Sequence, residues 1–205
     1  MTTSTLDIAP KLRGRPREFD MDSALDEALR VFSERGYYAA SISELTEAMG
    51  LTAGSIYKAF GDKRGVFLAV FSRYRQVRQQ LIDDTLATSP NAHEKLRALV
   101  TYFADASCGE SGRRGCLVVG SATELALFDE EVAGRVAVAF DFDEKRILDL
   151  IRLGHSDGSV AKHVDPEGTA CALLALTKGM RVIGKTGRNT AQMLAAVETA
   201  MKLLN

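Results

Sequence analysis

The spacing of apolar residues along the chain predicts helices throughout. Leu25, Ala28, Leu29 and Phe32 recur at the i, i+3, i+4, i+7 spacing that places side chains on one face of a helix. An aspartate at position 20 or 22 is suited to cap the start of this helix, and a glycine at position 36 fits the left-handed position that ends one. No segment shows the strict alternation of a half-buried strand, so the chain is predicted to be all-α.

Two short helices joined by a tight turn are predicted over residues 41–60. Ser41 and Glu44 have the spacing of a capping box, in which each side chain accepts a hydrogen bond from the other residue's backbone amide. Gly50 supplies the permissive backbone of the turn, and Thr52 can cap the second helix. This arrangement is a helix-turn-helix.

The remainder of the chain also has helical periodicity, without internal repeats. Asp62 can cap a long helix, and Ser89-Pro90 ends it. A glycine-rich basic loop is expected over 109–115, and Asp165-Pro166 marks another helix start. The helices predicted after the helix-turn-helix are 62–88, 93–107, 116–128, 129–153, 165–186 and 190–204.

Composition narrows the functional classes. The 205 residues are 46% hydrophobic and 26% charged, as in an ordinary globular protein. No apolar run reaches the roughly 18 residues needed to span a bilayer, and the N-terminus lacks the apolar stretch of a signal peptide, so a cytoplasmic location without membrane contact is expected. The three cysteines and three histidines lack metal-ligand spacing, and catalytic motifs are absent, which predicts neither metal, cofactor nor enzyme activity.

The distribution of charge is more informative than its sum of −1. Lys11, Arg13, Arg15 and Arg17 lie within seven positions near the N-terminus. Such a basic arm can contact DNA phosphates even in a nearly neutral protein, and the alternative is a solvated tail.

Residues 41–63 resemble the DNA-binding region of TetR/AcrR-type transcriptional regulators. Gly54, Tyr57, Phe60 and Lys63 occupy the characteristic places, and the resemblance extends over about residues 15–75. Thr46 and Met49 stand where the family often has alanine, and Gly65 replaces a more usual helix former, which predicts a softer joint after the motif. The resemblance implies three parts: a basic flexible arm over 1–18, an N-terminal three-helix helix-turn-helix domain over 19–65, and a C-terminal helical ligand-binding and dimerisation domain over 66–205.

The second helix of such a motif enters the major groove of double-stranded operator DNA. The exposed residues at its start are expected to contact bases or backbone, and the resemblance implies that Tyr57 and Lys63 bind phosphates, although Tyr57 could instead be a core aromatic. The arginines of the arm resemble a minor-groove arm. The predicted DNA contacts are Arg13, Arg15, Arg17, Ser41, Thr52, Ala53, Ser55, Tyr57, Lys58 and Lys63.

A homodimer reading a near-palindromic operator is expected, since one such module makes few contacts. Small residues on the last two long helices permit close helix approach, unless these faces are buried within one subunit. The predicted interface comprises Gly168, Ala172, Ala175, Leu176, Gly179, Leu194, Val197 and Met201.

The resemblance further implies a pocket for a small-molecule effector whose identity the sequence does not reveal. Its binding would release the operator, as in a repressor; an activator is the alternative. The residues expected to line the pocket, or otherwise to form ordinary core, are Tyr102, Phe103, Cys116, Phe128, Phe140 and Phe142. An enzyme is disfavoured because catalytic motifs are absent, and a module that has lost DNA binding is disfavoured because Tyr57, Lys63 and the arginine cluster are present.

Cys116 suggests a second means of sensing. It follows Arg113 and Arg114 at the start of a predicted helix, where a thiol pKa is lowered and the reactive thiolate is favoured. The segment resembles a sub-group of these regulators, some of which sense oxidants or electrophiles, and Cys108 is close enough in sequence to act as a resolving thiol. The alternative is that Cys116 is a small buried hydrophobic residue.

Overall fold

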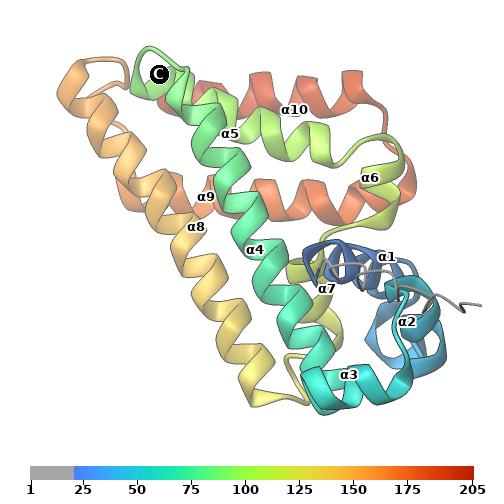
Figure 1. Cartoon of the computed structure of the whole chain (residues 1–205). Coiled ribbons are helices and arrows are strands. Elements are labelled where there is room, and N and C mark those ends of the chain that lie inside the picture. Colours follow the sequence, from blue (N-terminus) through green and yellow to red (C-terminus); the bar gives the residue numbers. More distant parts are fainter. Residues whose placement is uncertain (1–20) are drawn as a thin grey trace, which may run out of the picture.

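The structure, a computed structural model, describes residues 21–205 and is built from helices; that part of the chain contains no strand (Figure 1). The all-α prediction is confirmed. The helices are α1 (Met21–Ala39), α2 (Ile42–Met49), α3 (Ala53–Phe60), α4 (Lys63–Ala87), α5 (Ala92–Ala106), α6 (Gly109–Arg114), α7 (Leu117–Glu124), α8 (Glu130–Asp157), α9 (Pro166–Ile183) and α10 (Thr190–Met201), with short 3₁₀ turns η1 (Gly184–Thr186) and η2 (Lys202–Leu204).

The helix starts around the helix-turn-helix follow from local capping. The Ser41 hydroxyl accepts from the Glu44 amide at 3.2 Å, and the Glu44 carboxylate accepts from the Ser41 amide at 2.9 Å, which completes the predicted capping box. Gly50 adopts a left-handed conformation with φ 64°, and the side chains of Thr52 and Asp62 cap α3 and α4. These short-range predictions are confirmed because the caps depend on residues three apart.

Several helix boundaries differ from the prediction, and α8, for example, continues to Asp157 instead of ending at 153. Residues 109–114 form α6 rather than a loop, since Gly112 fits against the end of α5, where a Cβ would lie 2.2 Å from the Ser107 carbonyl oxygen. Helix α7 ends at Glu124, four residues early. Asn189 rather than Thr190 caps α10, because it forms a full capping box with Gln192.

The joint between α3 and α4 is tight. A Cβ at Gly65 would lie 1.8 Å from the carbonyl oxygen of Phe60, so only glycine permits the first turn of α4 to approach the end of α3 this closely. The sequence predicted that Gly65 softens the joint after the motif, whereas in the structure Gly65 allows α3 and α4 to pack closely there.

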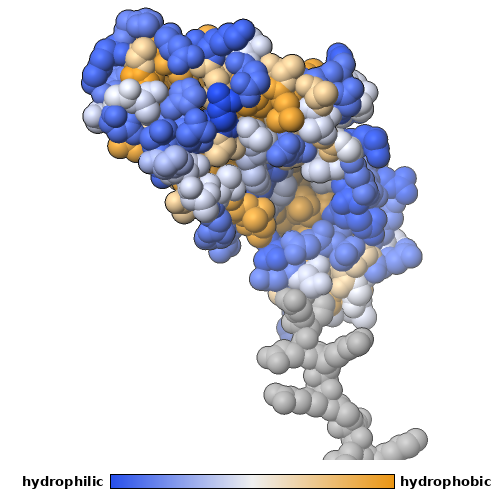
Figure 2. All heavy atoms as spheres, turned by 90° about the horizontal axis from the view of Figure 1, so that it is seen from above, coloured by the Kyte–Doolittle hydropathy of each residue, from blue (hydrophilic) through white to orange (hydrophobic). Residues whose placement is uncertain are grey.

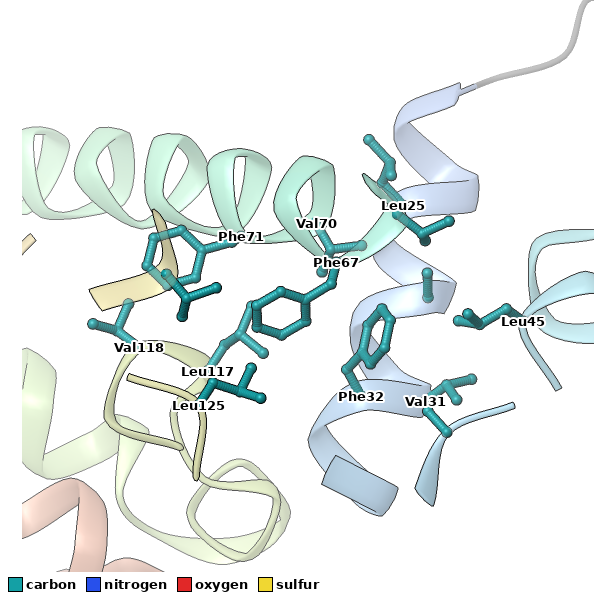
Figure 3. Packing of buried hydrophobic residues seen from close by; sticks show 14 of the residues in the cluster. Leu25, Val31, Phe32, Leu45, Phe67, Val70, Phe71, Leu117, Val118 and Leu125 are labelled. Atoms are coloured by element: carbon teal, nitrogen blue, oxygen red, sulfur yellow. The ribbon is translucent and has the colours of Figure 1, made fainter. Parts of the chain in front are cut away.

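Helix α4 joins two hydrophobic clusters. In the first, Phe67 of α4 lies between Phe32 of α1 and Leu117 of α7, Phe71 lies beside Val118 of α7, and α2 packs on the far side of α1 (Figure 3). The second cluster is formed by the later part of α4, including Ile82, with helices α5, α8, α9 and α10. The predicted division at residue 65 thus falls in the first turn of a helix that contributes to both clusters.

A set of polar side chains separates the two clusters, and we call it the polar layer. Its charged members are Arg75 and Arg78 of α4, Asp143 of α8, and Lys178 and Arg181 of α9. On α4 they fall between Phe71 of the first cluster and Ile82 of the second. This is where polar chemistry is available inside the otherwise apolar helical body.

The face seen in Figure 2 is mostly hydrophilic and carries hydrophobic patches. Within residues 21–205, no helix combines the length and apolar character needed to cross a membrane. The same residues hold no group of histidine, cysteine and acidic side chains suited to bind a metal ion.

Candidate DNA-binding surface and sensor site

The start of α3 presents small polar side chains to solvent. Ala53, Ser55 and Lys58 are exposed, and Lys58 makes no hydrogen bond or ion pair within the described residues. The Thr52 hydroxyl accepts from the Ser55 amide at 3.1 Å and lies 2.9 Å from the Ser55 hydroxyl, so this pair is already ordered as one unit. Hydroxyls held in this way can still donate to or accept from a base or phosphate.

Tyr57 lies on the same exposed surface. Its side chain is 52% exposed, whereas Ile56 beside it is completely buried in the first cluster. The interpretation of Tyr57 as a core aromatic is therefore wrong, and its hydroxyl is free to meet a phosphate. Ser41 is exposed but is committed to the capping box. The predicted arm residues Arg13, Arg15 and Arg17 lie outside the described residues.

Lys63 is engaged within the protein. Its ammonium group donates to the carbonyl oxygens of Tyr37 and Ala40, both at 2.9 Å, and of Tyr38 at 3.3 Å. It also lies 4.6 Å from the centre of the Tyr37 ring. An ammonium has three N–H bonds, so in this state none is left for the phosphate that the sequence predicted. Lys63 instead ties the end of α1 to the start of α4.

Polar contacts join the helix-turn-helix to the helices behind it. Arg64 pairs with Asp129, the N-cap of α8, through hydrogen bonds of 2.6 and 2.9 Å. The Glu124 carboxylate at the end of α7 accepts from the Tyr38 amide at 3.3 Å, just after the kink at Gly36, where φ is 78°. Movement of α7 or α8 is thus connected directly to the ends of α1 and α4.

The polar layer holds more positive than negative charge. Asp143 is shared by Arg75 at 3.0 Å and Lys178 at 2.5 Å, with all three side chains largely buried. Arg78 and Arg181 form no ion pair within the described residues. Arg181 is 2% exposed, donates to the carbonyl oxygen of Gly115, and leaves its Nε and Nη1 without a partner.

Cys116 lies beside these two arginines as the N-cap of α7. It is 9% exposed, and the Tyr74 hydroxyl donates to its sulfur at 3.4 Å. Burial alone would raise the pKa of the thiol, but Arg78, the Tyr74 hydroxyl, the backbone amide of Val119 and Arg181 together lower the pKa below its ordinary value. Burial and the neighbouring thiol raise the pKa of the Tyr74 hydroxyl, so it stays protonated as the donor.

The cause of this lowered pKa differs from the sequence-based expectation. Arg113 and Arg114, adjacent in sequence, are not the source; Arg114 contacts Glu110 and Glu34 on the outside of the protein. Arg78 and Arg181 come from helices about 40 and 65 residues away in sequence, and local pattern carried no signal for them. Cys108 donates to the Ala104 carbonyl oxygen at 3.3 Å, and both cysteines are free thiols.

The predicted pocket residues fall into two groups. Four of them border the polar layer: Arg78 lies 5.2 Å from the Tyr102 ring, Lys178 lies 4.5 Å from that of Phe103 and 5.7 Å from that of Phe140, and Cys116 is as described above. Phe128 is 77% exposed on the loop after α7, so it lines no interior pocket. Phe142 is 43% exposed and stacks with Arg75 and Arg146 on the outer side of α4 and α8.

The predicted dimer residues also separate by exposure. On α9 the small residues Gly168, Ala172, Ala175 and Gly179 are all exposed, with Leu176 half-buried beside them, and Leu194 of α10 is 40% exposed. Val197 and Met201 are 1% and 2% exposed and pack inside the second cluster. These two residues belong to the interior of the subunit because they face α5 rather than solvent.

Comparisons with known families cover both parts of the chain. A family described as "Bacterial regulatory proteins, tetR family" matches residues 24–70. A second, described as "Tetracyclin repressor-like, C-terminal domain", matches residues 92–200.

Two of the individual proteins that match do so over nearly the full length, and a third matches over about two thirds of this chain. A solved structure of the TetR family transcriptional regulator CifR, as a cysteine mutant with a 26-base-pair double-strand operator DNA, is 32% identical, with a TM-score of 0.81 over 92% of this chain and 98% of that one. The transcriptional repressor ComR of Escherichia coli K12 is 28% identical over 99% of this chain and 97% of its own. The transcriptional activator FasR of Mycolicibacterium smegmatis is 30% identical over 66% of this chain and 60% of its own.

Proposed function

The chain belongs to the TetR family of bacterial transcriptional regulators, and we propose that it is a homodimeric repressor that binds a near-palindromic operator and is released by a small-molecule effector. The observation that carries this proposal is the exposed polar start of α3 on a capped helix-turn-helix, in a chain 32% identical to an operator-bound regulator.

Recognition of the operator is assigned to the start of α3. Thr52, Ala53 and Ser55 are proposed to face the major groove, where each base pair presents its own pattern of donors, acceptors and methyl groups. Tyr57 and Lys58 are proposed to contact phosphates, since both are exposed on the same helix. The predicted contacts by the arm remain part of the proposal, whereas Lys63 is left out because its donors are already used.

Fluorescence anisotropy with labelled DNA from upstream of the protein's own gene tests DNA binding. Each phosphate contact adds about −0.9 to the slope of log affinity against log salt, so a dimer should show a steep dependence. Ser55→Ala should change the preference among mutated operators, while leaving the salt slope unchanged. Absence of salt-sensitive binding to any upstream fragment would contradict the proposal.

The dimer is proposed to form through the exposed faces of α9 and α10. Gly168, Ala172, Ala175 and Gly179 form a strip without large side chains, which allows two helices to pack closely. Sedimentation velocity should find a dimer for the native chain and a monomer for Ala175→Glu, which buries an unpaired charge in the contact. Val138→Glu is the matched control, because Val138 is an exposed residue of α8 outside the proposed interface, and this variant should remain a dimer.

Release by the effector is proposed to run through the contacts of α7 and α8 with the helix-turn-helix. A ligand that separates α4 from α7 or α8 would shift Glu124 or Asp129, and with them the ends of α1 and α4. The ligand then favours the state with poorer operator affinity to the extent that it binds that state more tightly.

A thiol-based switch at Cys116 is the second candidate function. The lowered thiol pKa favours the nucleophilic thiolate, and a cavity of about 310 Å³ between the end of α1 and α7 has Cys116 in its wall. With N-ethylmaleimide as the electrophile, the thiolate forms a sulfur–carbon bond, the double bond of the maleimide opens, and its other carbon takes a proton from solvent. The added bulk would enter this cavity between α1 and α7.

Alkylation of the DNA-bound protein tests this switch. N-ethylmaleimide should release the operator from a Cys171→Ser background, which removes the exposed cysteine. Adding Cys116→Ser should abolish the release, whereas adding Cys108→Ser should preserve it. Release that persists without Cys116 would exclude the switch.

A reporter gene under the bound promoter, measured with and without the protein, distinguishes a repressor from an activator.

A further inference from the structure

A groove on the outside of α4 leads to Arg78. It has a volume of about 440 Å³, which lies in the range of small-molecule sites. Leu29 of α1, Val77 and Leu81 of α4 and Tyr102 of α5 give it largely apolar walls. Arg78 is the one basic residue in the lining.

Arg78 is held in place but forms no ion pair with a carboxylate within the described residues. Its Nη1 donates to the Tyr74 hydroxyl at 3.0 Å, and its guanidinium lies 5.2 to 5.5 Å from the rings of Tyr74, Tyr102 and Phe103. Its Nη2 is buried without a hydrogen-bond partner. The carboxylate of the polar layer, Asp143, is already shared by Arg75 and Lys178.

A buried guanidinium with an unused donor is unfavourable unless an acceptor, preferably an anion, reaches it. Carboxylates are suited to this because they accept charge-assisted hydrogen bonds from arginine in a planar arrangement. We propose that the groove binds a small organic monocarboxylate, with its carboxylate on Arg78 and its apolar body against Leu29, Leu81 and Tyr102. This inference rests on the proposed function in taking that compound to be the effector.

The rim of the groove selects for a single negative charge. Asp26 and Asp105 both line it. Asp26 is neutralised by Arg73 through hydrogen bonds of 2.8 and 2.7 Å, whereas Asp105 is exposed and forms no ion pair within the described residues. A second carboxylate pointing outward would therefore be repelled by Asp105, which disfavours dicarboxylates.

Occupation of the groove is linked to Cys116 and to the helix-turn-helix. Arg78 is the largest favourable influence on the Cys116 thiolate, so a carboxylate bound to Arg78 should make that thiolate less stable and slow its alkylation. Leu29 lies on α1, so the same ligand contacts the DNA-binding part directly. The slower alkylation of Cys116 provides a readout of ligand binding that does not need DNA.

Isothermal titration calorimetry of the full chain without DNA tests the site. The probes are benzoate and hexanoate as monocarboxylates, isophthalate as a dicarboxylate, benzyl alcohol as a neutral relative, and inorganic phosphate. At least one monocarboxylate should bind, the other three classes should bind more weakly, and Arg78→Gln should weaken binding by about tenfold or more. Arg146→Gln is the matched control, since Arg146 also stacks on an aromatic ring but lies outside the groove.

Asp105→Asn tests the selectivity on an exposed position where folding is not at risk. It should strengthen monocarboxylate binding a few-fold and allow isophthalate to bind.

The proposal is overturned if neither monocarboxylate binds, if phosphate binds equally well, or if binding is the same in Arg78→Gln and Asp105→Asn as in the native chain. Binding that follows these variants but never alters operator affinity would support the site and refute the effector role. Operator binding without any carboxylate binding would refute the site and leave the regulator intact.

Discussion

Replacing Lys63 with methionine distinguishes a structural role for this lysine from a role in phosphate binding. Methionine keeps most of the apolar stem and removes the charge and its donors. The three carbonyl oxygens of Tyr37, Tyr38 and Ala40, at 2.9 to 3.3 Å, would lose their shared donor at the end of α1.

The expected loss of stability follows from these contacts. Hydrogen bonds to charged groups contribute about 1.5–3 kcal/mol each, but the three share one half-buried cation and do not add, so we expect a loss of about 2–4 kcal/mol. For a chain of 205 residues this corresponds to a fall in Tm of roughly 5–15 °C. Thermal unfolding followed by circular dichroism, at one protein concentration, measures it.

Operator binding supplies the second half of the test. Lys63→Met should leave the salt slope unchanged, whereas the matched Lys58→Met should reduce it by about 1.8 for the two subunits of a dimer and leave Tm unchanged. A Lys63→Met protein with native Tm and a slope reduced as much as in Lys58→Met would refute the structural role and restore the phosphate contact predicted from the sequence.

Three further predictions concern the links behind the DNA-binding surface. Asp129→Asn retains an N-cap side chain for α8 but loses the charge that Arg64 binds. Because the pairing with Arg64 lowers the pKa of Asp129 to about 2, the native chain should be more stable than the variant above about pH 4, and this difference should vanish as the pH falls through 2. Acid unfolding followed by circular dichroism measures the difference. Glu124→Ala should leave operator affinity within a few-fold but reduce the loss of affinity on alkylation of Cys116, and an undiminished loss would show that α7 does not carry the signal. The alkylation rate of Cys116 should reach half its maximum at a lower pH than the rate of an ordinary thiol does, and Arg181→Met should move this midpoint to higher pH. An unchanged midpoint would exclude Arg181 as a cause of the lowered thiol pKa.

The helix-turn-helix could be predicted from the sequence because its determinants are local. Ser41 with Glu44, Gly50, Thr52 and Asp62 each act within three or four residues, and the structure has every one of these caps and turns as predicted. The exposure of the strip on α9 also follows from helical periodicity. Here pattern and structure depend on the same short-range geometry.

The surroundings of Cys116 could not be predicted to the same extent. Arg78 and Arg181 meet Cys116 only because α4, α7 and α9 pack together, and the sequence contains no sign of that meeting. Phe128 had the same hydrophobic signal as Phe103, yet it lies in solvent because α7 ends early. Lys63 occupies the position where the family resemblance predicted a phosphate contact, but its ammonium donates to three carbonyl oxygens at the kinked end of α1, which the sequence pattern does not indicate.

The unbroken course of α4 has a geometric consequence. Its 25 residues give a rod about 37 Å long, which packs beside α3 at one end and in the second cluster at the other (Figure 1). A rotation of α4 by only about 5° about the polar layer would move either end of the helix by one to two ångströms. In a dimer with a twofold axis, the distance between the two helix-turn-helix units would change by twice that amount. Since DNA repeats about every 3.4 Å along one strand, so small a swing already approaches a misfit of one base pair.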